Sequence, residues 1–153
     1  MRSRLRLNGW CIFQQHFLHQ QLKKKRTFIM ITQHISTILW ITGIVTMLPL
    51  LQFFLPAMFI KRFNQTAIHD DVGLMFARHW GALVFVLGGL LVYAASHSEL
   101  RGPIIAAALI EKAALVLLII INLRQPFGKG FVLTAAFDGA CCVIYALYLA
   151  GLA

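Results

Sequence analysis

Four apolar runs dominate the chain and limit what it can fold into. They cover about residues 35–59, 75–95, 103–122 and 131–152. Each is long enough to cross a hydrocarbon core of about 30 Å as an α-helix. The segments between them are short, polar and rich in turn residues, so successive helices should be antiparallel neighbours. We therefore predict an all-α fold, an integral membrane four-helix bundle with antiparallel up-down topology.

The composition supports a membrane protein and excludes several classes of enzyme. Apolar residues make up 59% of the chain and charged residues 12%, against about 45–50% and 25% in soluble domains. With 153 residues, there is no room for a separate soluble catalytic domain beside four spanning helices. We also find no glycine-rich phosphate loop, nucleophile elbow or zinc-binding helix motif, and we assign no catalytic residue.

The positive charge is concentrated at the start of the chain. The net charge is +9, yet seven of the fourteen basic residues precede Met30, where no acidic residue occurs. The remaining chain carries seven basic and five acidic residues. A basic surface for nucleic acid is therefore not a property of the bundle, and we expect no nucleic-acid partner.

Residues 1–29 have the charge of a targeting segment but lack its apolar stretch and small-residue cleavage site. One back-translation of "KKRTFIM" places a purine-rich AGGA just before the Met30 codon, as in a bacterial ribosome-binding site. We hypothesise that translation begins at Met30, so that residues 30–153 form the transmembrane domain in a bacterial cytoplasmic membrane. The alternative is a basic, disordered arm lying on anionic lipid.

The orientation in the membrane depends on the same start site. The first and third loops carry Lys61, Arg62, Arg124 and Lys129, whereas the second carries Arg101 alone. Because Lys and Arg in short loops favour the cytoplasm, a chain that begins at Met30 would have both termini outside. The seven basic residues of 1–29 would invert that arrangement.

Prolines and glycines indicate how the first two spans pack. Pro49 and Pro56 are seven residues apart, lie on nearly the same helix face, and should bend the first span. The bend serves either to curve the helix for packing or as a moving hinge. Gly81 and Gly88 have the same spacing in the second span. Since small residues let helix backbones approach in lipid, we predict that they face another helix.

Polar residues inside the spans form a candidate site. An ionisable side chain at the centre of a bilayer costs at least about 2.5–3.5 kcal/mol, so it usually has a function and a partner. Counting the rise per residue brings Lys112 within reach of Asp138, and we predict that they pair. Gln52 comes to a similar level, and Arg78 would close the cluster from above. The full predicted set, with a ligand-binding or structural role, is Gln52, Arg78, His79, Glu111, Lys112, Asp138 and Tyr145.

Glu111 is the charge that is hardest to satisfy. Adjacent helical positions diverge by about 100°, so Glu111 and Lys112 cannot point at one another. We expect Glu111 to turn toward the first span or Tyr145, because Thr46 and Tyr145 lie at a similar height. The carboxyl is then either hydrogen-bonded for structural reasons or free to gain and lose a proton.

Residues that bind metals or haem do not form a set. Cys141 and Cys142 point in different directions on a helix, Cys11 stands apart, and His79 is alone near a span. We read the cysteines as small apolar residues and His79 as a local hydrogen-bonding group. No cofactor and no metal site is predicted.

Three segments carry a resemblance to a known group. They are "FARHWGALVFVLGGLLVYAA", "RGPIIAAALIEKAALVLL" and "AAFDGACCVIYALYL", in which Arg78, Gly81, Glu111 and Asp138 follow a shared pattern. Over about residues 74–148 the chain resembles small four-helix membrane proteins of the DoxX-like and ergosterol-28-like scaffold group. The resemblance implies a compact bundle that serves as an accessory subunit or scaffold.

Two functions agree with these features. The first is a non-enzymatic accessory or scaffold protein that lies in the bilayer and binds another membrane protein or a lipid-like ligand, with self-association as a further option. The cluster offers recognition groups without a complete catalytic set. The alternative is a proton-coupled small transporter or a membrane redox subunit that uses Glu111.

Overall fold

The structure, a computed structural model, describes residues 30–63 and 67–151. The chain divides into two units, Met1–His34 and Ile35–Ala153. The bundle belongs to the second unit, and of the first only residues 30–34 are described, as part of a helix. The predictions for residues 1–29 and for Cys11 lie outside the described residues.

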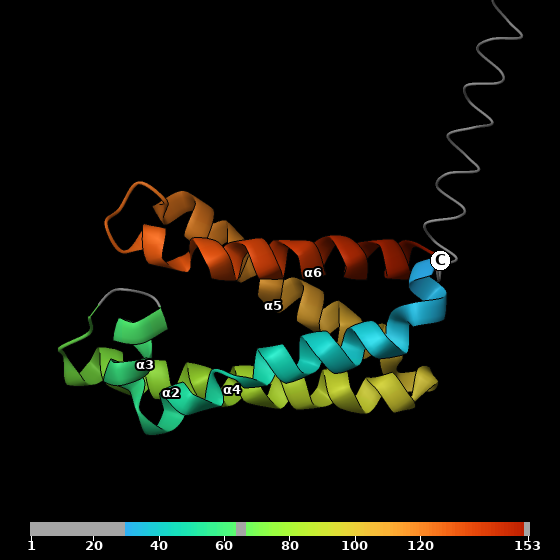
Figure 1. The fold of residues 1–153 in the computed structure, drawn as a ribbon, viewed down its shortest axis with the longest axis horizontal. Coiled ribbons are helices and arrows are strands. Elements are labelled where there is room, and N and C mark those ends of the chain that lie inside the picture. Colours follow the sequence, from blue (N-terminus) through green and yellow to red (C-terminus); the bar gives the residue numbers. More distant parts are fainter. Residues whose placement is uncertain (1–29, 64–66, 152–153) are drawn as a thin grey trace, which may run out of the picture. The chain divides into compact units, whose positions relative to one another are not determined.

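The bundle is built from α-helices, and the described ranges contain no strand. Figure 1 shows them running back and forth along one direction. The first helix covers residues 30–47. It is followed by α2 (Leu50–Phe54), α3 (Pro56–Phe63), α4 (Asp71–Ser96), the 3₁₀ turn η1 (Ser98–Leu100), α5 (Arg101–Asn122), the 3₁₀ turn η2 (Gly128–Phe131) and α6 (Val132–Ala150).

Four segments of the described residues are long and apolar enough to cross a membrane: Met30–Phe54, Asp71–Ser96, Ser98–Asn122 and Gly128–Ala150. The predicted four-helix membrane bundle is confirmed. The last three spans match the predicted ranges within a few residues, except that α4 begins earlier, where the Asp70 carboxylate accepts a 2.6 Å hydrogen bond from the Gly73 amide.

The first span departs most from its prediction, because the helix is interrupted. It ends at residue 47, and the Leu48 amide donates to the Val45 carbonyl at 3.2 Å in a tightened turn. The cause is Pro49, which has no N–H and whose ring blocks the carbonyl one turn earlier. Pro56 then begins α3, a position that proline tolerates. The predicted bend is confirmed, and α3 is a separate helix beyond the span.

Glycines bring the first helix and α4 together, as predicted. A methyl group added at Gly88 would lie 2.7 Å from both the Gly43 carbonyl oxygen and the Met47 side chain. One added at Gly81 would lie 2.6 Å from the Pro49 carbonyl oxygen. Both distances are shorter than van der Waals contact, so only glycine permits this approach of the two backbones.

Arg101 ties three helices together at the other end of the bundle. Its Nε donates to the Ala94 carbonyl at 3.0 Å, and its Nη2 donates to the Ala95 carbonyl at 2.8 Å and to the Ser36 hydroxyl at 2.7 Å. The last carbonyls of α4 have no partner within the helix, so a side-chain donor satisfies them. Arg101 thereby joins α5 to α4 and to the first helix.

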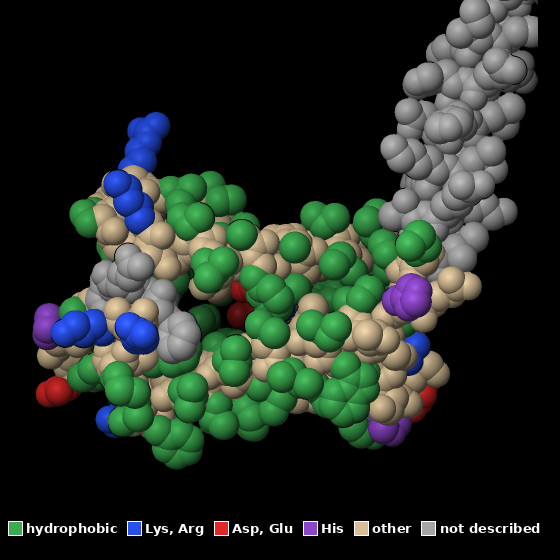
Figure 2. Space-filling view, in the orientation of Figure 1, with side chains coloured by type: hydrophobic (Ala, Val, Ile, Leu, Met, Phe, Trp, Pro, Cys, Tyr) green, Lys and Arg blue, Asp and Glu red, His purple; other side chains and the backbone are tan. Residues whose placement is uncertain are grey.

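The outward surface of the bundle is apolar. Figure 2 shows hydrophobic side chains along most of the visible face. Leu133 is 82% exposed, Ile110 71% and Ile121 68%. Water would penalise so much exposed apolar surface, whereas lipid does not. With the four spanning helices, this surface makes the chain a multi-pass membrane protein.

Candidate functional site

A cavity of about 320 Å³ lies inside the bundle, in the half that contains Pro49. Figure 2 shows a hollow between the helices with carboxylate atoms at its bottom. Its volume is within the range of small-molecule sites, about 300–1,000 Å³. Its walls come from the first helix and all later α-helices: Val45, Thr46, Leu48, Pro49, Leu51, Phe59, Trp80, Val84, Glu111, Lys112, Leu115, Leu133, Thr134, Phe137 and Asp138.

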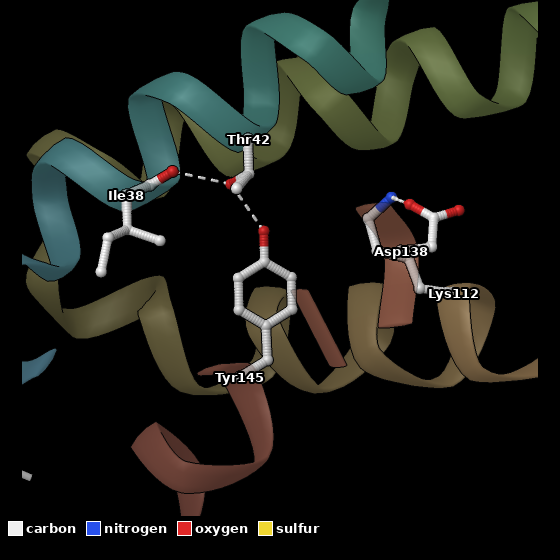
Figure 3. Close-up of polar contacts among 5 residues, drawn as sticks. All are labelled: Ile38, Thr42, Lys112, Asp138 and Tyr145. Carbon is white, nitrogen blue, oxygen red and sulfur yellow. Dashed lines mark hydrogen bonds and ion pairs between the residues drawn. The ribbon is translucent and has the colours of Figure 1, made fainter. Parts of the chain in front are cut away.

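An ion pair forms part of the cavity wall. The Lys112 Nζ donates to the Asp138 Oδ1 at 2.5 Å, with side chains only 3% and 6% exposed, so the predicted pair is confirmed. Figure 3 shows the two side chains meeting from α5 and α6. The Lys112 ammonium also lies 5.6 Å from the centre of the Phe137 ring, a cation–π distance. Each charge thus has the partner that a buried ion requires.

Two oxygen atoms of residues that line the cavity have no hydrogen-bond partner within the described part of the chain. They are the Thr46 Oγ1 and the Glu111 Oε2, and both atoms are buried. Thr46 is 4% exposed as a residue. A buried polar atom without a partner costs about 1–3 kcal/mol, so such atoms are uncommon and mark sites of interest.

Of the two predicted directions for Glu111, the first helix or Tyr145, Tyr145 is not the one found. The Tyr145 hydroxyl lies 2.7 Å from the Thr42 hydroxyl, and Figure 3 shows Tyr145 pointing from α6 to the first helix. Thr42 is one helical turn from Thr46, so the Tyr145 hydroxyl lies about one helical turn along the bundle from the Thr46 side chain. Glu111 does face the first helix in the predicted sense, since it lines the cavity with Thr46.

The other predicted cluster residues lie elsewhere. Gln52 is buried and its Nε2 donates to the Ala77 carbonyl at 2.7 Å, which ties α2 to α4 outside the main cavity. Arg78 and His79 are exposed and line a separate pocket with Asp71. The prediction that Arg78 closes the cluster is wrong. Since Ala77 faces the interior, the next residue points about 100° away from it.

The thiols and histidines of the described residues form no metal site. Cys141 is buried, Cys142 is partly exposed, and both are free thiols. In residues 30–63 and 67–151 no three His, Cys, Asp or Glu side chains are grouped so that they could hold a metal ion. The chemistry available in the cavity is recognition by one ion pair, one free carboxyl oxygen and hydroxyl groups.

Several residues of the site were not identified from the sequence. The aromatic residues Phe59, Trp80 and Phe137 of the cavity wall look like any other lipid-facing rings in the sequence. One signal was present in the sequence. Thr42 and Thr46 are four residues apart in an apolar helix, so they share a face that lipid would not favour.

Comparison with known proteins gives no assignment, because no protein-family model, curated protein or solved structure matches the chain. The function is therefore argued from the cavity and its residues.

Proposed function

We propose that this chain is a small, non-enzymatic membrane protein that binds a lipid-like ligand in the cavity between its helices. The observation that carries the proposal is the pair of unpartnered oxygens, on Thr46 and Glu111, that line the same largely apolar cavity. A ligand with an apolar body and a polar head would fill the cavity and supply the missing hydrogen bonds.

The cavity is open to the bilayer. Leu133 lines it and is also 82% exposed, and Leu48 and Leu51 line it while 56% and 54% exposed. These side chains therefore belong to the cavity wall and to the lipid-facing surface together. A ligand dissolved in the membrane reaches the site sideways, without crossing water.

A cavity-filling variant tests this proposal. Leu115 lines the cavity, whereas Leu117 on the same helix is 58% exposed and lies outside it. We expect 1-adamantanol, a compact apolar alcohol, to bind saturably to the protein in lipid nanodiscs, measured by native mass spectrometry. Leu115→Trp should abolish that binding by occupying the space, and Leu117→Trp should leave it unchanged. Binding that survives Leu115→Trp, or no binding to the wild type, contradicts the proposal.

We further propose an accessory or scaffold role in a bacterial cytoplasmic membrane. The resemblance of residues 74–148 to the DoxX-like and ergosterol-28-like group supports it. Copurification of the tagged wild-type protein from its native membrane should recover a defined membrane partner. Recovery of the chain alone would contradict the scaffold role and leave the ligand site unaffected.

A second candidate, proton-coupled transport, is supported by Glu111 alone. A carboxyl oxygen without a partner inside a membrane is typical of sites that exchange protons. In liposomes, a transport protein would couple substrate uptake to proton movement, and Glu111→Gln would uncouple the two. A protein that binds 1-adamantanol but shows no Glu111-dependent proton flux contradicts transport.

A further inference from the structure

The ionisable groups around the cavity do not balance. Glu111, Lys112 and Asp138 line it, which is two acids and one base, and no other Lys, Arg or His contributes to the wall. Lys112 and Asp138 neutralise each other in their ion pair. Within the described residues the Glu111 carboxyl forms no ion pair, and the nearby Lys112 ammonium is already bonded to Asp138, in a setting where an unpaired charge is costly. A positively charged ligand group would complete the set.

The unpartnered oxygens require donors from the ligand. A helical threonine commonly donates its hydroxyl to the carbonyl four residues earlier, as Thr42 does to Ile38 at 2.8 Å. The Thr46 Oγ1 makes no such bond and shares the cavity with the Glu111 Oε2. An ammonium group offers three N–H donors, whereas an alcohol offers one. An ammonium therefore carries enough donors for both oxygens, whereas an alcohol does not.

The aromatic wall also favours a cation. Phe59, Trp80 and Phe137 line the cavity from three different helices. Ring faces attract cations, most strongly where water is excluded. The Lys112 ammonium, 5.6 Å from the Phe137 ring centre, already uses this wall in the same way.

From these three observations we infer that the cavity recognises apolar primary amines in their protonated form. Glu111 is the counter-ion, the Thr46 hydroxyl is a second acceptor, and the aromatic rings enclose the apolar body. This inference rests on the proposed function and names the chemical class of its ligand.

Two probes of the same shape test the inference. 1-Adamantylamine is a cation at pH 7, and 1-adamantanol carries a neutral hydroxyl on the same apolar cage. In phosphatidylcholine nanodiscs we expect the amine to bind at least about tenfold more tightly, because hydrogen bonds to a charged group are the stronger ones. Empty nanodiscs correct for partition into lipid.

Variants separate recognition from general attraction. Glu111→Gln should remove the preference for the amine, because loss of the carboxylate charge weakens binding of the cation far more than binding of the neutral alcohol. Thr46→Val, a substitution of similar shape, should weaken binding of the amine several-fold and binding of the alcohol by a smaller factor, because hydrogen bonds from a charged donor are the stronger ones. Glu99→Gln is the matched control, since it removes the same charge from exposed η1 outside the cavity.

The outcomes distinguish this inference from the function on which it rests. Equal affinity of the wild type for both probes, or a preference that survives Glu111→Gln, overturns the amine assignment and leaves the ligand cavity in place. Binding of neither probe to the wild type overturns the proposed function itself. If Glu111→Gln does not fold, the wild-type comparison and Thr46→Val still decide the question.

Discussion

The two ends of the bundle are built differently. At the end near Arg101 the core is closed: Leu39, Leu91, Ile105 and Tyr145 are 0% exposed. Arg101, Thr42 and Tyr145 all have hydrogen-bond partners there. At the end near Pro49 the helices enclose a cavity of about 320 Å³. The polar groups named at the closed end thus have partners within the fold, whereas the hollow end leaves two oxygens available.

One pair of residues shows the contrast most directly. Thr42 and Thr46 lie one turn apart on the first helix, and both are buried. Thr42 bonds to Ile38 and Tyr145, whereas the Thr46 Oγ1 has no partner within the described residues. Two residues of the same type therefore differ in role: the Thr42 hydroxyl links two helices, whereas the Thr46 hydroxyl, one turn away, is available as an acceptor.

The largest expected effect tests what holds the hollow end together. Lys112→Met should destabilise the bundle by about 3–5 kcal/mol, because it leaves the Asp138 carboxylate buried without a cation. Adding Asp138→Leu should recover much of that loss. Unfolding by denaturant in detergent measures the stability of Lys112→Met, Asp138→Leu and the double variant. If the losses of the two single variants simply add in the double variant, the ion pair contributes nothing as a pair, and another contact stabilises this end.

The next effect tests the close approach of the first helix and α4. Gly88→Ala should cost about 1–3 kcal/mol, because the new methyl group meets the Gly43 carbonyl oxygen. Gly89 is the matched control, since a methyl group there meets nothing within 4 Å. Gly89→Ala should leave thermal stability unchanged or raise it by up to about 1 kcal/mol through helix propensity. Equal behaviour of the two variants would contradict this packing.

The smallest effect compares the two threonines. Thr42→Val should cost about 1–2 kcal/mol, because it leaves the buried Tyr145 hydroxyl without its partner. Thr46→Val should be neutral or slightly stabilising, since no bond is lost and an unpartnered oxygen disappears. Thermal unfolding of the two proteins, in the same detergent and without ligand, gives the difference. If Thr46→Val loses more stability than Thr42→Val, then Thr46 is the threonine with a structural hydrogen bond, and the contrast between the two ends is wrong.

The sequence predicted features that depend on position along a helix axis. Apolar run length gave the four spans, rise per residue brought Lys112 level with Asp138, and heptad spacing put Gly81 and Gly88 on one face. Predictions that needed the rotation of a helix about its axis were less successful. Arg78 has a suitable depth but points away from the cluster, because Ala77 occupies the inward direction.

Other features depend on how helices pack, which no single segment records. Tyr145 lies at a depth in the membrane that suits a partner of Glu111, yet its hydroxyl forms a hydrogen bond with Thr42 of the first helix. The cavity also could not be predicted. It is a gap left by several helices at once, next to the turn where Pro49 interrupts the first of them.

The position of the opening, next to the exposed side chain of Leu133, has a consequence for where the ligand comes from. Leu48, Leu51, Phe59 and Leu133 all lie toward the membrane face that carries the first and third loops. The opening therefore lies toward that side of the bundle, and a lipid-like ligand of the proposed kind would enter from the leaflet on that side. Because the two leaflets of a cell membrane differ in composition, occupancy of the cavity would follow the content of that leaflet alone. Movement of ligand between leaflets would then change the fraction of protein that is filled, without any change in its total amount.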